Sequence, residues 1–246
     1  EKSFLEDTAK ALKDPQLRRN FKRAMSGLME KRRNVFPNAS ELEGLREQAS
    51  AVRRKTLSRL PELLELLEFN CERNGILVHW AETIEEANRI VLDIANEAEV
   101  RLAVKGKSMV SEEMGLNAFL EEHGIEAIES DLGEYIIQVD KELPSHIIMP
   151  AIHKNREEIS KLFQEKVDSN STSETAEEMT ATARKIMRKK FHDADMGLSG
   201  VNFAVAETGT LCLVENEGNG RFCTTLPKIH VALMGIEKVV ESLQDL

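Results

Sequence analysis

The most suggestive short pattern in the chain is Lys105-Gly106-Lys107-Ser108, between a predicted strand and a predicted helix. Two cations, a glycine and the free N–H groups at the start of a helix can bind a phosphate or a carboxylate. In parallel α/β sheets, ligands bind at the carboxyl ends of the strands, where this segment is expected. The pattern lacks the second glycine and the ending of a Walker A loop, so it does not predict nucleotide hydrolysis. An ordinary turn with exposed lysines is the alternative.

Glu207 is the candidate for a catalytic carboxylate. It follows the apolar run 202–206 and precedes Thr208-Gly209-Thr210. At the end of an apolar strand a carboxylate would be partly desolvated, which favours a role as a base or a nucleophile. Gly209 would let a substrate approach closely. The alternative is a structural glutamate that fixes a hairpin through hydrogen bonds to the backbone.

A third candidate segment covers residues 218–225, where Gly218 and Gly220 flank an asparagine and precede Arg221. The glycines allow a tight turn, and an arginine can bind a carboxylate or a phosphate in bidentate fashion. The hydroxyls of Thr224 and Thr225 could add hydrogen bonds. The segment therefore predicts an anionic ligand, with a plain glycine hairpin as the alternative.

The histidines and cysteines do not predict a metal site. The six histidines include no pair spaced i, i+4, and the three cysteines (Cys71, Cys212 and Cys223) are too far apart in sequence for a disulfide framework or an iron–sulfur motif. His153 and His230 are the histidines best placed to face a cleft. The cysteine usage fits a reducing compartment, so we expect a cytoplasmic protein.

The order of predicted elements indicates an α/β fold. Apolar runs that predict strands alternate with helical patterns, which is typical of a mainly parallel sheet covered by helices. The predicted strands of this part are 76–80, 101–104, 125–128 and 146–149, and the predicted helices are 83–98, 111–123 and 155–167. A polar linker at 168–173 precedes a basic helix at 175–191. Further on, the sequence predicts a hairpin of 202–206 and 210–214 that closes the sheet, a tight turn at 217–221, a strand at 229–234 and a final helix through 240.

The first 73 residues are predicted to form a basic helical extension in front of an α/β domain at 74–246. Helices are expected at 4–12 and 17–35, from a capping box at Ser40 to residue 60, and at 63–72, which ends at Asn74-Gly75. Residues 1–60 hold 15 Lys and Arg against 8 Asp and Glu, whereas the remainder holds 18 against 35. The basic helices have few aromatic residues and no recognised fold motif, which favours an acidic protein surface over nucleic acid, and a solvated helix face is the alternative. No apolar run is long enough to span a membrane.

Several longer motifs together resemble the LUD domain of the iron–sulfur subunit of the bacterial lactate-utilisation system. They are VKGKSM (104–109), DLGEY (131–135), HIIMPAIH (146–153), ADMGLSGVNFAVAETGT (194–210), NEGNGR (216–221) and HVALMGIEK (230–238). The resemblance covers nearly the whole chain. It implies a fold like that of ribose-5-phosphate isomerase and the CoA transferases. In the latter a catalytic glutamate precedes a glycine, and Glu207 looks like its counterpart.

The resemblance also implies a function. The chain is expected to belong to an electron-transfer complex that oxidises L-lactate to pyruvate with other subunits, and this part would bind a small anionic metabolite, partner subunits or both. The family subunit continues into a ferredoxin-like region with two [4Fe-4S] clusters, so no cofactor is expected within this chain and the clusters are implied for a missing C-terminal region. The alternative is an autonomous enzyme that acts on a CoA ester or a sugar phosphate with Glu207 as nucleophile or base. In a third interpretation, the basic N-terminal helices wrap a partner subunit.

Overall fold

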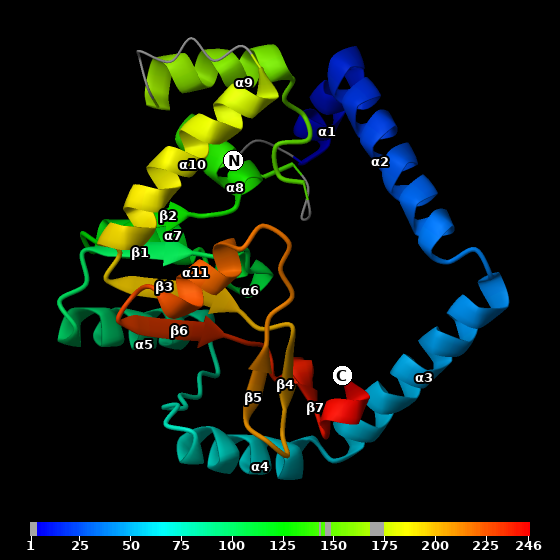
Figure 1. Ribbon diagram of the computed structural model, residues 1–246, viewed down its shortest axis with the longest axis vertical. Coiled ribbons are helices and arrows are strands. Elements are labelled where there is room, and N and C mark those ends of the chain that lie inside the picture. The colour runs from blue at the N-terminus through cyan, green and yellow to red at the C-terminus, as the bar shows by residue number, and fades with distance from the viewer. Residues whose placement is uncertain (1–3, 143, 146–148, 168–174) are drawn as a thin grey trace. The chain divides into compact units, whose positions relative to one another are not determined.

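The computed structural model describes residues 4–142, 144–145, 149–167 and 175–246, and the chain forms two compact units (Figure 1). Unit 1 comprises Glu1–Glu43 and Leu132–Lys185, and unit 2 comprises Gly44–Asp131 and Ile186–Leu246. The candidate residues of the sequence analysis at 105–108, 207–209 and 218–225 all belong to unit 2.

Unit 2 is built on a four-stranded sheet whose strands all run parallel, in the order β2-β1-β3-β6. The strands are β1 (Leu102–Lys105), β2 (Glu126–Glu129), β3 (Met196–Gly200) and β6 (Ile229–Leu233). The sequence prediction of a mainly parallel sheet covered by helices is confirmed. The strand at β3, which lies in the middle of the sheet, had no counterpart among the predicted strands.

Helices cover both faces of this sheet, and side chains alternate between the faces along each strand. Ala103, Met196 and Leu198 point to the face that packs against α5 (Ile84–Glu97) and α7 (Leu116–Glu122). Val104 points to the other face, where Cys223 of α11 (Asn219–Thr225) contacts it. In Figure 1, α11 crosses the sheet over β3, which it contacts together with β1 and β6.

A second, three-stranded sheet in unit 2 has the order β5-β4-β7. Its strands are β4 (Phe203–Val205), β5 (Thr210–Cys212) and β7 (Val239–Val240). The predicted hairpin is confirmed as the antiparallel pair β4–β5, but it pairs with β7 and does not close the main sheet. Helix α4 (Leu60–Arg73) buries Leu63 and Leu67 against this sheet. Two 3-10 turns follow β6, at Ile236–Lys238 and Leu243–Asp245.

Unit 1 consists of helices. They are α1 (Phe4–Lys13), α2 (Pro15–Val35), the start of α3 (Ala39–Ser58), α8 (Leu132–Asp140), α9 (Arg156–Leu162) with its π-helical continuation (Phe163–Val167), and the first part of α10 (Ala176–Asp193). Asp14 caps α2 by accepting hydrogen bonds from two backbone N–H groups of its first turn. The core lies between α8, α9 and α10, where Ile136, Phe163 and Met179 are buried together.

Most predicted helices are confirmed, with three corrections. The predicted helix 111–123 is broken by Gly115, which adopts a left-handed conformation between α6 (Met109–Glu113) and α7. The predicted cap at Ser40 is wrong, because the Asn38 side chain accepts hydrogen bonds from the N–H groups of residues 40 and 41. The predicted final helix is a 3-10 turn followed by β7, because Val239 and Val240 pair with β4.

The predicted strand at 76–80 is also wrong. These residues have no strand pairing, although Ile76 and Val78 pack against the core below the three-stranded sheet. Residues 146–148 of the predicted strand 146–149 and the predicted linker at 168–173 lie outside the described residues. No helix of the described residues is long and apolar enough to cross a membrane.

Candidate functional site

Polar side chains gather where β1 and β2 end. The parallel register pairs Lys105, the last residue of β1, with Glu129, the last residue of β2. Because successive side chains alternate, both point to the face that carries α6 and α7. The chain order reverses between β1 and β3, and crevices at such positions are where open parallel sheets bind ligands. This edge of the sheet is therefore the candidate functional site.

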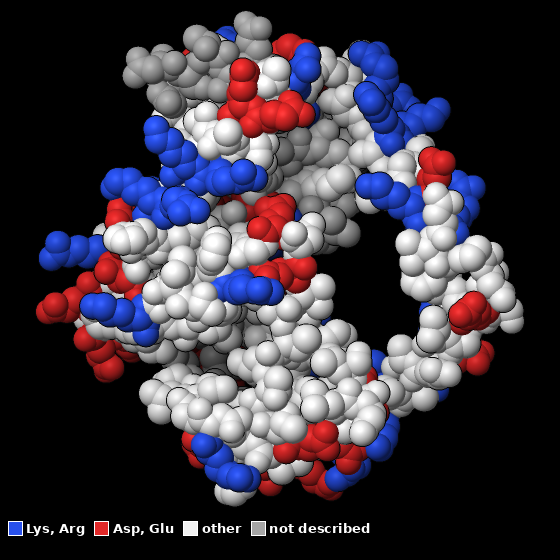
Figure 2. Space-filling view, in the orientation of Figure 1, with Lys and Arg blue, Asp and Glu red and all other residues white. Residues whose placement is uncertain are grey.

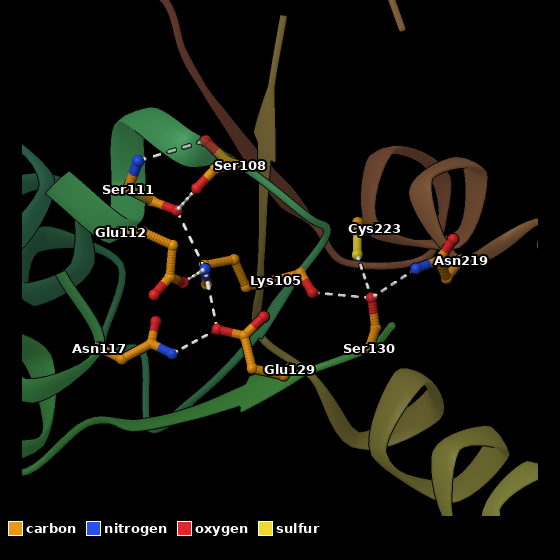
Figure 3. Close-up of polar contacts among 9 residues, drawn as sticks. All are labelled: Lys105, Ser108, Ser111, Glu112, Asn117, Glu129, Ser130, Asn219 and Cys223. Carbon is orange, nitrogen blue, oxygen red and sulfur yellow. Dashed lines mark hydrogen bonds and ion pairs between the residues drawn. The ribbon is translucent and has the colours of Figure 1, made fainter. Parts of the chain in front are cut away.

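Lys105 is the centre of a buried ionic cluster (Figure 3). Its ammonium nitrogen lies 2.6 Å from a Glu112 carboxylate oxygen and 2.8 Å from a Glu129 carboxylate oxygen. It also donates to the hydroxyl of Ser111 at 3.0 Å. Asn117 of α7 donates its side-chain amide to the same Glu129 oxygen that contacts Lys105. The cluster thus joins β1, β2, α6 and α7.

The charges of this cluster depend on one another. Burial alone would lower the pKa of Lys105, but the nearby carboxylates of Glu129 and Glu112 outweigh burial and raise that pKa. The ammonium group therefore remains charged at neutral pH, and it has no solvent-exposed surface. Its geometry suits it to hold the ends of the two strands together. It does not offer a free cation to a ligand.

A second polar group lies on the opposite face of the sheet, under α11. Ser130 donates its hydroxyl to the carbonyl of Lys105 at 2.7 Å, and its hydroxyl oxygen lies 3.5 Å from the sulfur of Cys223. The side-chain amide of Asn219 reaches the same hydroxyl at 3.5 Å (Figure 3). Burial raises the pKa of Cys223 to about 11, so this thiol stays protonated and is a poor nucleophile at neutral pH.

The other residues of the Lys105-Gly106-Lys107-Ser108 pattern also have protein partners. The ammonium of Lys107 lies 3.2 Å from a carboxylate oxygen of Asp131, and about a third of the Lys107 side chain is exposed. Ser108 caps α6 and accepts a hydrogen bond from the N–H of Ser111. A side chain at Gly200 would come within 3.1 Å of the Ser108 hydroxyl, so β3 packs closely against this turn.

The segment 218–225 forms a helix rather than the predicted tight turn. Gly218 adopts a left-handed conformation in front of α11, and Gly220 packs against Leu213, which allows the helix to start here. Arg221 is exposed, and its guanidinium lies 3.3 Å from the carboxylate of Glu215. Thr224 and Thr225 both donate their hydroxyls to the carbonyl of Arg221, inside the helix.

Glu207 belongs to the turn between β4 and β5 in the three-stranded sheet, not to the carboxyl ends of the four-stranded sheet. It is exposed, so the partial desolvation expected from the sequence is not found. Its carboxylate accepts a hydrogen bond of 3.0 Å from the N–H of Leu243. Gly209 has a φ of +66°, and a side chain there would collide with the α4 backbone at Asn70 and Cys71. Both residues thus make contacts within unit 2 that hold this hairpin in place.

Sequence reasoning missed the carboxylates of the site. Glu112, Glu129 and Asp131 surround the lysines of the pattern, yet only the lysines were singled out. A signal was available, because Glu129-Ser130-Asp131 follows the apolar strand residues 125–128 directly. Polar residues at the end of a second parallel strand must lie beside those at the end of the first.

The two histidines expected to face a cleft differ in their surroundings. His153 of unit 1 hydrogen-bonds to the Ser145 hydroxyl at 2.7 Å and to Glu142 at 2.8 Å, and it lines a polar pocket of about 320 Å³. His230 of β6 shares a hydrogen bond of 2.8 Å with the Ser199 hydroxyl. Neither belongs to a group of metal-ligating side chains in the described part of the chain.

The cysteines of this chain do not fit an iron–sulfur cluster. Cys71 lies in α4, Cys212 in β5 and Cys223 in α11, and within the described residues no three metal-ligating side chains converge. The thiol of Cys71 hydrogen-bonds to the carbonyl of Gly209. A cluster needs several thiolates directed at one point, and these three thiols do not provide that arrangement.

Comparisons with known proteins support the family resemblance. The chain is 43% identical over all 246 residues to "Lactate utilization protein B" of Bacillus pumilus, where it covers 52% of that protein. It is 42% identical over 234 residues to the "Uncharacterized electron transport protein YkgF" of Escherichia coli, where it covers 49%. The chain thus spans about half the length of these curated relatives. No solved structure matches significantly, so the expected likeness to ribose-5-phosphate isomerase and CoA transferases stays a prediction.

The family model with the description "LUD domain" matches residues 64–246, which include most of α4 and both sheets of unit 2 together with α8, α9 and α10. This range contains the polar side chains at the carboxyl ends of β1 and β2, which we call the carboxyl-end site. It also contains every candidate residue of the sequence analysis. The chain belongs to the LUD-domain family.

Proposed function

We propose that this chain is part of a lactate-utilisation protein and works in an electron-transfer complex that oxidises L-lactate to pyruvate. The observation that carries the proposal is the 43% identity over the whole chain to a protein named for lactate utilisation. The name of the Escherichia coli relative, an electron transport protein, supports the redox part. In this proposal the complex works in the cytoplasm, which the three free cysteines favour.

Within this complex, we assign the carboxyl-end site to a small anionic metabolite. Lys107 and Arg221 are the cations of the predicted set that keep exposed surface, and both contact carboxylates, Lys107 that of Asp131 and Arg221 that of Glu215. The carboxylate of a ligand would replace the carboxylates of Asp131 and Glu215 as the partner of these two cations. Neither cation would then be left unpaired. Lys105 would support the site by holding the ends of β1 and β2 together.

The electrons would leave through clusters outside this chain. The cysteines described above do not fit a cluster, and the relatives are about twice as long. In the proposal, the full-length protein carries two [4Fe-4S] clusters beyond the segment described here. Native protein purified without oxygen should then contain about eight irons per chain. Protein with its full native mass and no iron would contradict this part of the proposal.

Growth on L-lactate tests the proposal as a whole. A strain of the source organism without the gene should fail to grow on L-lactate as the only carbon source, and the full-length gene should restore growth. The Lys107→Met/Arg221→Met double variant should restore it poorly. Lys185→Met/Arg188→Met, which removes two exposed cations of α10, serves as the matched control. Normal growth of the deletion strain would refute the proposal.

The alternative of an autonomous enzyme with Glu207 as nucleophile or base gains no support from the geometry. Glu207 is exposed, and a backbone N–H group holds its carboxylate. On our proposal a Glu207→Gln strain grows normally on L-lactate. A total loss of growth with a stably folded variant would revive the alternative.

A further inference from the structure

Helix α2 of unit 1 carries a basic face. Its sequence contains seven Lys and Arg residues and a single acidic residue. At the helical repeat of 3.6 residues, Arg18, Arg19, Lys22, Arg23 and Arg33 fall on one side, and Figure 2 shows basic side chains along this helix. The half-buried apolar residues, which are Leu17, Phe21, Ala24 and Leu28, fall on the other side. The helix thus turns a row of cations to the solvent.

These five cations have no acidic partner within the described part of the chain. No ion pair joins any of them to a carboxylate, and the one side-chain bond among them runs from Arg33 to the carbonyl of Met29, four residues earlier. Several other cations of the protein are paired with carboxylates, as Lys105, Lys107 and Lys154 show. The charge of this face is therefore available for an intermolecular contact.

Unit 2 carries an acidic surface whose charge is opposite to that of the basic face of α2. Residues 62–99 contain ten Asp and Glu against two Arg. On α5, Glu85, Glu86, Asp93 and Glu97 are all exposed. Glu86, Asp93 and Glu97 lie on the side of the helix away from its buried residues, which are Asn88, Val91 and Ala95. Glu85 lies at the flank of this side, and one exposed cation, Arg89, lies within it. From Glu86 to Glu97 the acidic face extends for about 16 Å, and the basic face of α2 from Arg18 to Arg33 for about 22 Å.

We infer that the basic face of α2 docks on the acidic face of α5 in a second copy of the protein. Charge complementarity favours this occupant, because both faces are on the same chain, are exposed and have comparable length. Nucleic acid and anionic membranes are less suitable partners, because residues 61–246 carry a net charge of −17 and would be repelled by a polyanion. The inference does not rest on the proposed metabolic function.

The contact has a simple symmetric form. Two copies related by a twofold axis would make it twice, with α2 of each copy on α5 of the other, which closes the assembly as a dimer. Because exposed charges supply most of the attraction, the dimer should weaken as salt screens them, with a Debye length of about 10 Å at about 0.1 M.

Sedimentation equilibrium of the full-length protein tests the inference. Wild type should be dimeric at about 50 mM NaCl and should dissociate at about 500 mM NaCl. Arg18→Glu/Lys22→Glu/Arg23→Glu should raise the dimer dissociation constant at least about tenfold at low salt. The control Arg184→Glu/Lys185→Glu/Arg188→Glu changes the net charge equally on exposed positions of α10 and should leave the dimer intact. Circular dichroism checks that each variant keeps its helices.

A mixing experiment separates this contact from any other. Glu85→Lys/Asp93→Lys/Glu97→Lys should be monomeric alone, as should the α2 variant. A mixture of the two should form a 1:1 heterodimer, because one contact is then wild type and the other has both charges reversed. The inference is overturned if wild type is monomeric at low salt, if the α2 variant dimerises like wild type, or if the mixture stays monomeric.

Discussion

At the scale of single residues, Lys105 determines the charge balance where β1 and β2 end. Its ammonium is fully buried between Glu112 and Glu129, and Glu129 is itself almost completely buried. Removing the cation would leave the buried carboxylate of Glu129 without its counter-charge, which is costly in a medium that cannot solvate it. The lysine pattern identified from the sequence is thus part of the architecture of the site.

Lys105→Met should lower the free energy of unfolding by about 3 to 5 kcal/mol. The methionine keeps most of the side-chain volume, so the loss reflects charge and not a cavity. Urea denaturation measures it. Lys107→Met is the matched control, because Lys107 is partly exposed and its pair with Asp131 is screened, and it should cost less than about 1 kcal/mol. Equal losses in the two variants would contradict the assigned difference in burial.

The same lysine predicts a pH dependence with a definite sign. In the folded protein the pKa of Lys105 is raised above the ordinary value of 10.5. Its contribution to stability is therefore complete below about pH 10.5 and is lost as the pH rises through the folded-state pKa. The difference in unfolding free energy between wild type and Lys105→Met should shrink as the pH rises above about 10.5. A difference that stays unchanged from about pH 9 to about pH 12 would contradict this linkage.

The three thiols should react at different rates. Burial raises the pKa of Cys71, and burial raises that of Cys223 to about 11, whereas Cys212 is only partly buried. In a protein of residues 1–246 we expect one fast thiol toward a disulfide reagent at about pH 8, and three thiols after denaturation in urea. Cys212→Ser should remove the fast reaction. A fast thiol that persists in this variant would show that a buried cysteine is accessible.

At the scale of elements, the hairpin β4–β5 depends on a glycine that contacts α4. A side chain at Gly209 would lie 2.6 Å from backbone atoms of Asn70 and Cys71, and the φ of +66° disfavours any other residue. Gly218 has a similar backbone conformation, with φ +81°, but nothing within 4 Å of an added side chain. Substitutions at Gly209 and Gly218 therefore separate the energetic cost of a steric collision from the cost of a strained backbone.

Gly209→Ala should therefore destabilise the protein more than Gly218→Ala. We expect a loss of at least about 3 kcal/mol for Gly209→Ala and about 1 kcal/mol for Gly218→Ala, because only the first adds a backbone collision to the cost of the left-handed conformation. Urea denaturation of both variants measures the difference. A loss at position 209 no larger than at position 218 would mean that α4 does not pack against this turn.

The elements also show what the sequence could predict. Strands β1, β2 and β6 and helix α5 follow from apolar patterning and a capping threonine, Thr83, because local signals and tertiary contacts agree there. Strand β3 was missed because two of its five residues are glycines. Gly197 is required by packing, since a side chain there would overlap the carbonyl of Cys223 in α11. Such a contact between distant segments leaves no local signal.

For the site, the sequence identified the strand ends but not their charge balance. Lys105 was recognised by its neighbours in sequence, whereas its partners Glu112 and Glu129 are brought to it by α6 and β2. Residues 217–221 were predicted as a turn because Gly-Asn-Gly is a turn sequence, but the left-handed Gly218 precedes a helix. In both cases the residue types were recognised from the sequence. What the sequence did not predict was the arrangement that the fold gives them.

At the scale of the whole molecule, the family is established and the metabolic function is proposed. The LUD-domain match covers residues 64–246, and the two relatives described above are about twice as long as this chain. The carboxyl-end site of unit 2 and the basic face of α2 are the two surfaces to which we assign contacts. The first is tested by lactate metabolism and the second by self-association, so the two proposals can fail independently.

The most direct test of the central claim is the rate of L-lactate oxidation to pyruvate by the full-length protein, purified without oxygen together with the proteins that accompany it. The proposed function predicts pyruvate formation coupled to reduction of an added electron-accepting dye. Preparations from a strain without the gene should lack the activity, and the Lys107→Met/Arg221→Met protein should be strongly impaired. If extracts without this protein oxidise L-lactate at the wild-type rate, the proposed function is wrong.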